Sequence, residues 1–230
     1  MTNTNTFHQP ENSVTASALH LQDVCVSVEN TKLAGPINLT VAPGEIFTIM
    51  GPSGCGKSSL LAAISGTLST NFKVSGDIFL GSQSITALPP EDRHIGMLFQ
   101  DDLLFPHLSV GENLKFGIPA AIKNRNERDA LAEKALDDAG LPGYMSRDPA
   151  TLSGGQRARV AVLRTLLSRP CVLLLDEPFS KLDVELRDKF RQFVFRHVKA
   201  HHLPTLLVTH DPDDASATGG EIIQMANTFT

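Results

Sequence analysis

The chain has 230 residues, enough to bury a full hydrophobic core, and its 41% hydrophobic and 20% charged residues are typical of a soluble globular protein. A formal net charge of −5 argues against a protein that holds nucleic acid by charge alone, though not against a local basic patch, and we expect no nucleic-acid partner. No apolar run approaches the roughly 18 to 20 residues of a membrane-spanning helix, so a role at a membrane would depend on a partner protein.

The N-terminal residues 1–17 are polar and lack the apolar segment of a secretion signal, which predicts a disordered tail ahead of one domain over 18–230. Between 19 and 50, short apolar or alternating runs separated by turn residues predict strands, and a hairpin is expected at 73–85. From about 102 to 153 the pattern changes to helical segments broken by glycine and proline, which predicts a helical subdomain.

After residue 155, helices alternate with two apolar strands, which predicts an α/β fold with a mainly parallel sheet covered on both faces. His201 and His202 are interpreted as positive charge at the end of the helix that follows Asp183, rather than as metal ligands. The apolar residues of that helix recur at helical spacing and are assigned to the core: Leu186, Phe190, Phe193 and Val194.

A glycine-rich loop follows the apolar run "IFTIM". The residues "GPSGCGKS" match the pattern G-x-x-x-x-G-K-[ST], in which glycines let successive backbone N–H groups converge on phosphate oxygens. We expect Lys57 to reach the β- and γ-phosphates and the Ser58 hydroxyl to bind Mg²⁺. The pattern therefore predicts a site for a nucleoside triphosphate. Its expected residues are Gly51, Pro52, Ser53, Gly54, Cys55, Gly56, Lys57 and Ser58.

Polar residues end three further apolar strands. In "CVLLLDEP", Asp176 is expected beside the phosphate loop, where it would hold the water shell of Mg²⁺, and Glu177 is placed to polarise a water against the γ-phosphate. His210, after "TLLVT", is interpreted as a γ-phosphate contact. Gln100, which ends "IGMLFQ", supplies a neutral oxygen and is assigned to both the nucleotide and the metal.

A second glycine-rich helix start has the sequence "LSGGQ". One chain cannot easily wrap two such helix starts around a single γ-phosphate, whereas a second chain related by a twofold axis can. We therefore expect a homodimer in which this segment of one protomer closes over the phosphate loop of the other, with ATP between them. The segment comprises Leu152, Ser153, Gly154, Gly155 and Gln156.

Taken together, these motifs resemble the ATP-binding-cassette (ABC) ATPases over roughly residues 19 to 225, in the family's order. The resemblance implies a P-loop NTPase: a RecA-like parallel-sheet core with an antiparallel β subdomain and an inserted α-helical subdomain. It also implies a head-to-tail dimer that holds two ATP. It assigns Glu177 as catalytic base, His210 as the switch histidine and Asp183, in "SKLD", as a cross-dimer contact, and it adds Ser59 to the nucleotide contacts.

The stretch 89–119 looks like the ATPase subunits of bacterial type I importers, the group that handles thiamine, ferric iron, molybdate, sulfate and polyamines. In that group the segment after Gln100 receives a coupling helix from an integral-membrane permease, which in turn works with an extracytoplasmic solute-binding protein. The implied location is cytoplasmic, peripheral on the inner face of the membrane, and three widely spaced cysteines agree with a reducing compartment. The expected apolar docking residues, with a buried helix start as the alternative, are Leu103, Leu104, Phe105 and Pro106.

The chain also departs from the family pattern. Val28 stands where an aromatic residue usually stacks on adenine, and Lys181 stands where a small residue is usual. The chain ends soon after "EIIQM", so no C-terminal regulatory barrel is expected. Two alternatives stay open: the ATPase of an ABC exporter or lipoprotein-release complex, and a soluble ABC protein acting on ribosomes or DNA.

Overall fold

The computed structural model describes residues 17–29, 31–99 and 101–225. The expected tail lies, except for Ser17, outside the described residues, and so does Gln100. The described chain divides into two compact units. We call them the sheet unit (17–97, 171–177 and 195–225) and the helical unit (98–170 and 178–194), and each is described by itself.

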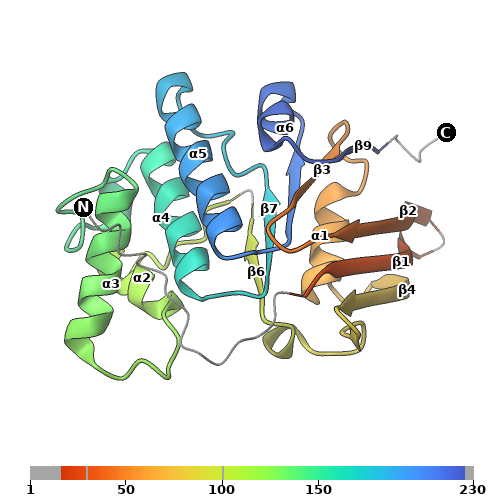
Figure 1. Ribbon diagram of the computed structural model, residues 1–230, viewed down its shortest axis with the longest axis horizontal. Coiled ribbons are helices and arrows are strands. Elements are labelled where there is room, and N and C mark those ends of the chain that lie inside the picture. The colour runs from red at the N-terminus through yellow and green to blue at the C-terminus, as the bar shows by residue number, and fades with distance from the viewer. Residues whose placement is uncertain (1–16, 30, 100, 226–230) are drawn as a thin grey trace. The chain divides into compact units, whose positions relative to one another are not determined.

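The sheet unit contains an antiparallel and a parallel sheet (Figure 1). The antiparallel sheet has the order β2-β1-β4-β5, and its strands are β1 (Leu19–Val28), β2 (Thr31–Val41), β4 (Phe72–Leu80) and β5 (Gln83–Ser84). The second sheet has the order β6-β7-β8-β3-β9, with β7, β8, β3 and β9 paired in parallel. Its strands are β3 (Ile46–Met50), β6 (Ile95–Leu98), β7 (Val172–Asp176), β8 (Thr205–Thr209) and β9 (Ile222–Gln224). The predicted α/β class and the hairpin at 73–85 are confirmed.

The central strands of the parallel sheet are buried on both faces. Every residue of β7 and of β8 is buried, as the uninterrupted apolar runs predict for strands covered on two sides. Helix α1 (Lys57–Ser65) packs on β7, β1 and β2, whereas α6 (Pro212–Thr218) packs on β3 and β8. Polar residues at the carboxyl ends of these strands are therefore held on a rigid support.

Arg93, after the short helix η1 (Pro90–Asp92), fixes the end of α1. Its guanidinium donates to the carbonyls of Ala63 and Ile64 at 2.9 and 2.7 Å, and to those of Leu88 and Thr86 at 2.9 and 2.8 Å. Burial lowers the pKa of this guanidinium below its usual range. A cation at the C-terminal carbonyls of a helix also opposes the negative end of its dipole.

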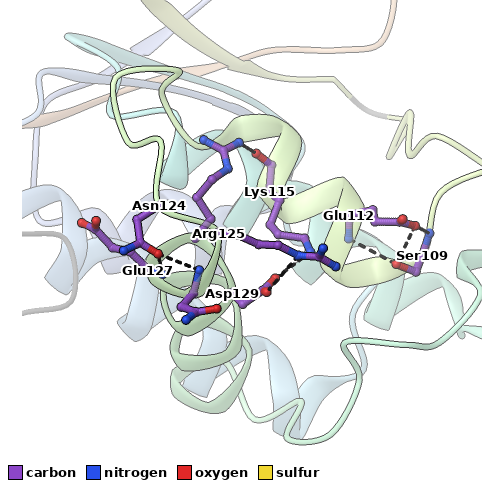
Figure 2. Close-up of polar contacts among 9 residues, drawn as sticks. Ser109, Glu112, Lys115, Asn124, Arg125, Glu127 and Asp129 are labelled. Carbon is purple, nitrogen blue, oxygen red and sulfur yellow. Dashed lines mark hydrogen bonds and ion pairs between the residues drawn. The ribbon is translucent and has the colours of Figure 1, made fainter.

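The helical unit is built around α2 (Val110–Gly117), α3 (Arg125–Asp138) and α4 (Gly154–Leu167), with η2 (Pro149–Thr151) before α4. Helix α2 packs on both α3 and α4. Ser109 and Glu112 form a capping box at the start of α2, and the Asn124 side chain caps α3 (Figure 2). Such caps satisfy N–H groups that have no partner within the helix.

Side chains tie α2 to α3 as well. Lys115 Nζ lies 2.6 Å from Asp129 Oδ1, and Arg125 lies 3.9 Å from the same carboxylate (Figure 2). Arg128 donates to the carbonyls of Ile118, Pro119 and Ile122 at 3.1 to 3.2 Å. These contacts supplement the buried apolar residues of α2 and α3, such as Leu114, Ala132 and Leu136.

Helix α5 (Val184–Ala200) follows the "SKLD" segment. Phe190 and Val194 are buried as expected, and Leu186 and Phe193 are half-buried. His201 follows the helix directly, and its ring packs at a tilt against that of His197, with 4.3 Å between centroids. The interpretation of His201 and His202 as positive charge at the helix end stays a prediction. Residues four apart share one helix face, and the i−4 neighbour here is a buried histidine. Among the described residues, no helix is both long and apolar enough to cross a membrane.

Candidate nucleotide site

The glycine-rich loop connects the buried strand β3 to helix α1, in the sheet unit. Lys57, the first residue of α1, is 6% exposed, and its Nζ donates to the carbonyls of Gly51 and Pro52 at 2.9 and 2.8 Å. The lysine at the end of the loop thus bonds to the carbonyls at its beginning. An ammonium held at this position can exchange its carbonyl partners for phosphate oxygens.

Two glycines allow the loop to pass close to neighbouring backbone. A Cβ at Gly56, where φ is +91°, would lie 2.5 Å from the carbonyl oxygen of Leu33. A Cβ at Gly51 would lie 2.6 Å from the carbonyl oxygen of Met225. Real Cβ atoms do not approach oxygen so closely, so the shape of the loop requires glycine at both positions. Leu33 and Met225 also line a cavity of about 310 Å³ beside the loop.

Asp176 ends β7 and is 5% exposed. Burial raises the pKa of its carboxyl above the usual range and the nearby Glu177 charge raises it further, whereas a hydrogen bond with Ser58 and the Lys57 charge act in the opposite direction. A buried carboxylate beside a serine hydroxyl provides hard oxygen donors of the kind that Mg²⁺ prefers. The structure thus brings Ser58, Lys57 and Asp176 together at one end of the parallel sheet.

Glu177 and His210 follow β7 and β8, which are neighbours in the sheet. His210 Nδ1 lies 2.8 Å from Glu177 Oε1. The imidazole is largely open to solvent, with 61% of its side chain exposed, whereas the carboxylate is 14% exposed. Glu177 has φ of 48°, and its backbone N–H donates to the carbonyl of Val208. This is an exposed imidazole that contacts a nearly buried acid.

The "LSGGQ" segment starts α4, in the helical unit. Ser153 is the N-cap: its Oγ accepts from the Gln156 N–H at 3.2 Å, and Gln156 Oε1 accepts from the Ser153 N–H at 2.9 Å. A Cβ at Gly154 would meet only the end of the Arg157 side chain, 4.0 Å away, whereas at Gly155 it would lie 3.1 Å from Leu182. The N–H groups of Ser153 and Gln156 are thus bonded within the capping box. The backbone at Gly154 is accessible.

The "SKLD" segment follows in the same unit. The Asp183 carboxylate accepts from the Leu186 N–H at 3.0 Å at the start of α5. Lys181, the unusual residue of this segment, lies 3.3 Å from Asp101 Oδ1. Arg157 on α4 forms a closer pair with Asp102, at 2.9 Å. Sequence reasoning missed both acidic partners, because they directly follow Gln100 and have no motif of their own.

An exposed apolar patch lies on the helical unit after Gln100. Leu103 is 55% exposed, Pro106 is exposed, and Leu104 and Phe105 are half-buried. Phe116 on α2, which the sequence did not indicate, is 68% exposed, and its ring meets that of Phe105 edge-on at 4.7 Å between centroids. An exposed aromatic ring beside a half-buried one, with an exposed leucine and proline close in the chain, is typical of a contact surface.

The family described as "ABC transporter" matches residues 34–180, more than half of the chain. The chain belongs to the ABC transporter family. It is an ATP-binding subunit of that family with ATPase activity, and the predicted P-loop NTPase fold is confirmed.

Three curated ATP-binding proteins illustrate the similarity. YnjD of Escherichia coli, an uncharacterized ABC transporter ATP-binding protein, is 49% identical over 90% of this chain and 95% of its own length. An Fe(3+) ions import ATP-binding protein of Rhizobium meliloti, FbpC 1, is 41% identical over 82% of this chain and 53% of its own length. A maltose/maltodextrin import ATP-binding protein of Photobacterium profundum, MalK, is 37% identical over 90% and 55%. The chain spans about half the length of these two import proteins.

A solved structure shares the fold. The ATP-binding cassette MJ0796, solved as a dimer in a post-hydrolysis state bound to ADP and Pi, superposes with a TM-score of 0.79 at 28% sequence identity. The superposition covers 91% of this chain and 96% of that chain.

Proposed function

We propose that this ABC ATPase energises a membrane permease for the import of a small solute and works as a head-to-tail dimer that holds ATP between its protomers. Relatives named as iron, maltose and sulfate import proteins support the direction of transport. The observation that carries the proposal is the exposed apolar patch that follows Gln100, since a subunit driving a permease needs a surface on which the permease docks.

In this proposal the sheet unit binds the phosphates. Lys57 releases the carbonyls of Gly51 and Pro52 and bonds to the β- and γ-phosphates, while the loop N–H groups surround the phosphate oxygens. Ser58 and Asp176, together with Gln100, would hold Mg²⁺, which supplies positive charge to the phosphates when bound. The raised pKa of Asp176 fits this role, because a carboxyl destabilised by burial gains most from a nearby cation.

Glu177 is proposed as the general base. It accepts a proton from water as the water oxygen bonds to the γ-phosphorus, and the bond from that phosphorus to the β-phosphate oxygen breaks, which leaves ADP and phosphate. His210 holds the carboxylate through Nδ1. In the imidazolium form it would also offer its Nε2–H to a phosphate oxygen.

The helical unit completes the site in trans in this proposal. Ser153 and the backbone at Gly154 and Gly155 of one protomer would face the γ-phosphate held by its partner, and Asp183 would contact the partner as well. ATP then favours the closed dimer because only the closed state uses both helix starts, and hydrolysis removes that preference.

The test is to purify the tagged chain from its own cells in mild detergent, beside the variant Leu103→Asp. Val74→Asp, at a solvent-facing position of β4 that is 37% exposed, is the matched control. We expect a multi-span permease with the wild type and the control but not with Leu103→Asp, while all three purified chains hydrolyse ATP. Recovery of only ribosomal or DNA-repair components would exclude transport. A permease with no associated solute-binding protein would instead indicate export.

A further inference from the structure

The chain contains one tyrosine and no tryptophan, and this tyrosine contacts the "LSGGQ" segment. Tyr144 lies in the connection between α3 and η2, after Gly143, whose φ is +74°. Its hydroxyl accepts a hydrogen bond from Gln156 Nε2 at 3.0 Å. No motif in the sequence links the two residues, which are 12 positions apart.

This hydrogen bond satisfies the end of the Gln156 carboxamide that the capping box does not use. The Ser153 N–H is a donor, so only the Oε1 end of the carboxamide can satisfy it, and the distance between them is 2.9 Å. The NH₂ end must then point away from the helix start and needs an acceptor, which the Tyr144 hydroxyl provides. Both ends of the side chain are therefore committed, and the capping box has one orientation rather than two.

Tyr144 is itself held firmly. The guanidinium of Arg147 lies over its ring at 4.0 Å from the centroid, and the Arg147 N–H donates to the Tyr144 carbonyl at 3.0 Å. The segment that carries Tyr144 is also bonded to the start of α2, where Val110 and Gly111 donate their N–H groups to the carbonyls of Arg147 and Met145. The phenol is thus anchored to the start of α2 through backbone hydrogen bonds, which gives it a fixed position from which to hold Gln156.

We infer that Tyr144 is a positioning residue for the ATPase reaction: its hydroxyl holds the Gln156 carboxamide, and through it the Ser153 cap, in the orientation that meets the γ-phosphate. This inference rests on the proposed function, in which the "LSGGQ" segment closes over the nucleotide of the partner. Ser153 Oγ accepts from the Gln156 N–H, which leaves its own hydrogen able to donate to a phosphate oxygen.

Loss of the Tyr144 hydroxyl should weaken ATP-driven closure of the dimer more than it slows ATP hydrolysis in the closed dimer. Without Tyr144 as acceptor the carboxamide is held by the Ser153 N–H alone and is less firmly ordered, and ordering it on each closure costs free energy that the wild type does not spend. Once the dimer is closed, the groups around the γ-phosphate are the same. We therefore expect the ATP concentration at half-maximal rate to rise while kcat at saturation stays close to that of the wild type.

The test is Tyr144→Phe in the full chain, which keeps the ring and its stacking with Arg147. We expect a roughly three- to tenfold rise in KM for ATP, less than a twofold change in kcat, and a melting temperature lowered by at most about 2 to 4 °C. Ser146→Ala removes a hydroxyl from the same connection and is the matched control, with KM unchanged. An unchanged KM in Tyr144→Phe, or equal losses of kcat in both variants, overturns the inference.

Tyrosine emission gives an independent readout, because in this chain it comes from Tyr144 alone. In Glu177→Gln, which should bind ATP without turnover, we expect the emission to change at the ATP concentrations that drive dimer formation. Emission that stays constant while the dimer forms overturns the role of Tyr144 and leaves the proposed function intact. If no ATP-dependent dimer forms and the wild type does not hydrolyse ATP, the proposed function fails instead.

Discussion

His210 Nδ1 and Glu177 Oε1 lie 2.8 Å apart, although 33 residues separate them in the chain. The contact arises because β7 and β8 are parallel neighbours whose carboxyl ends meet at the same edge of the sheet. The carboxylate is mostly buried and the imidazole mostly exposed, so the acid is held by a partner that itself faces solvent.

Glu177→Gln is the most informative substitution at this pair. Glutamine can still bond to His210 but cannot accept a proton from water, so we expect ATP turnover to fall by at least about 100-fold while ATP binding persists. Size-exclusion chromatography with light scattering should then show a dimer in ATP and a monomer without it. A variant that stays monomeric in ATP and Mg²⁺ contradicts the sandwich dimer.

Lys57→Ala tests the phosphate loop. The ammonium now bonds to two loop carbonyls and would bond to the phosphates in the ATP complex, so its loss should reduce turnover by at least about 100-fold. Lys73→Ala, at an exposed position on β4, is the control and should hydrolyse ATP normally. A steady-state phosphate-release assay measures both. Normal turnover in Lys57→Ala would remove this lysine from the mechanism.

Val28 lies at the end of β1, half-buried and opposite Phe72 of β4. If this is the position that faces adenine, Val28→Tyr should tighten nucleotide binding about tenfold, since stacking of a base on an aromatic ring contributes about 1 to 3 kcal/mol. Calorimetric titration with ADP avoids turnover during the measurement. Val28→Leu controls for size alone, and equal affinities in the two variants would show that the base lies elsewhere.

Arg93→Met should destabilise the sheet unit. Four carbonyls, two of them at the end of α1, would lose their donor, and buried acceptors without partners are costly. We expect a loss of about 2 to 4 kcal/mol in the free energy of unfolding, measured from the urea midpoint by far-ultraviolet circular dichroism. Arg93→Lys keeps the charge with fewer donors and should lose less. Equal losses would assign the effect to geometry rather than to hydrogen bonding.

His197 makes stability depend on pH. Burial, and then the neighbouring His201, lower its pKa from the usual 6.5 to about 3. Because the unfolded chain binds this proton below pH 6.5 and the folded chain does not, stability falls between pH 6.5 and 3, by about 1.4 kcal/mol per pH unit. We expect roughly 2 kcal/mol less stability at pH 5 than at pH 7 from this group. His197→Phe should remove that part of the acid sensitivity, and an unchanged difference would assign it to other groups.

The sequence predicts best where one local pattern determines the structure. The run from β3 through the glycine loop into α1, and the polar residues that end β7 and β8, could be assigned because strand, turn and helix signals occur together there. Contacts between side chains that are not close in the sequence could not be assigned. Nothing local indicates that Arg93 reaches α1, that Tyr144 bonds to Gln156 or that the His201 ring packs against a buried histidine, since those partners depend on the tertiary fold.

The backbone of Glu177 is in the left-handed region, directly after a fully buried strand. For a residue with a Cβ this conformation costs about 1 to 2 kcal/mol, and asparagine or glycine would bear it more easily. Selection for heat resistance alone would therefore favour replacing this residue and would discard the proposed base in doing so. In the proposed mechanism, stability and ATP turnover therefore place opposite demands on this one position.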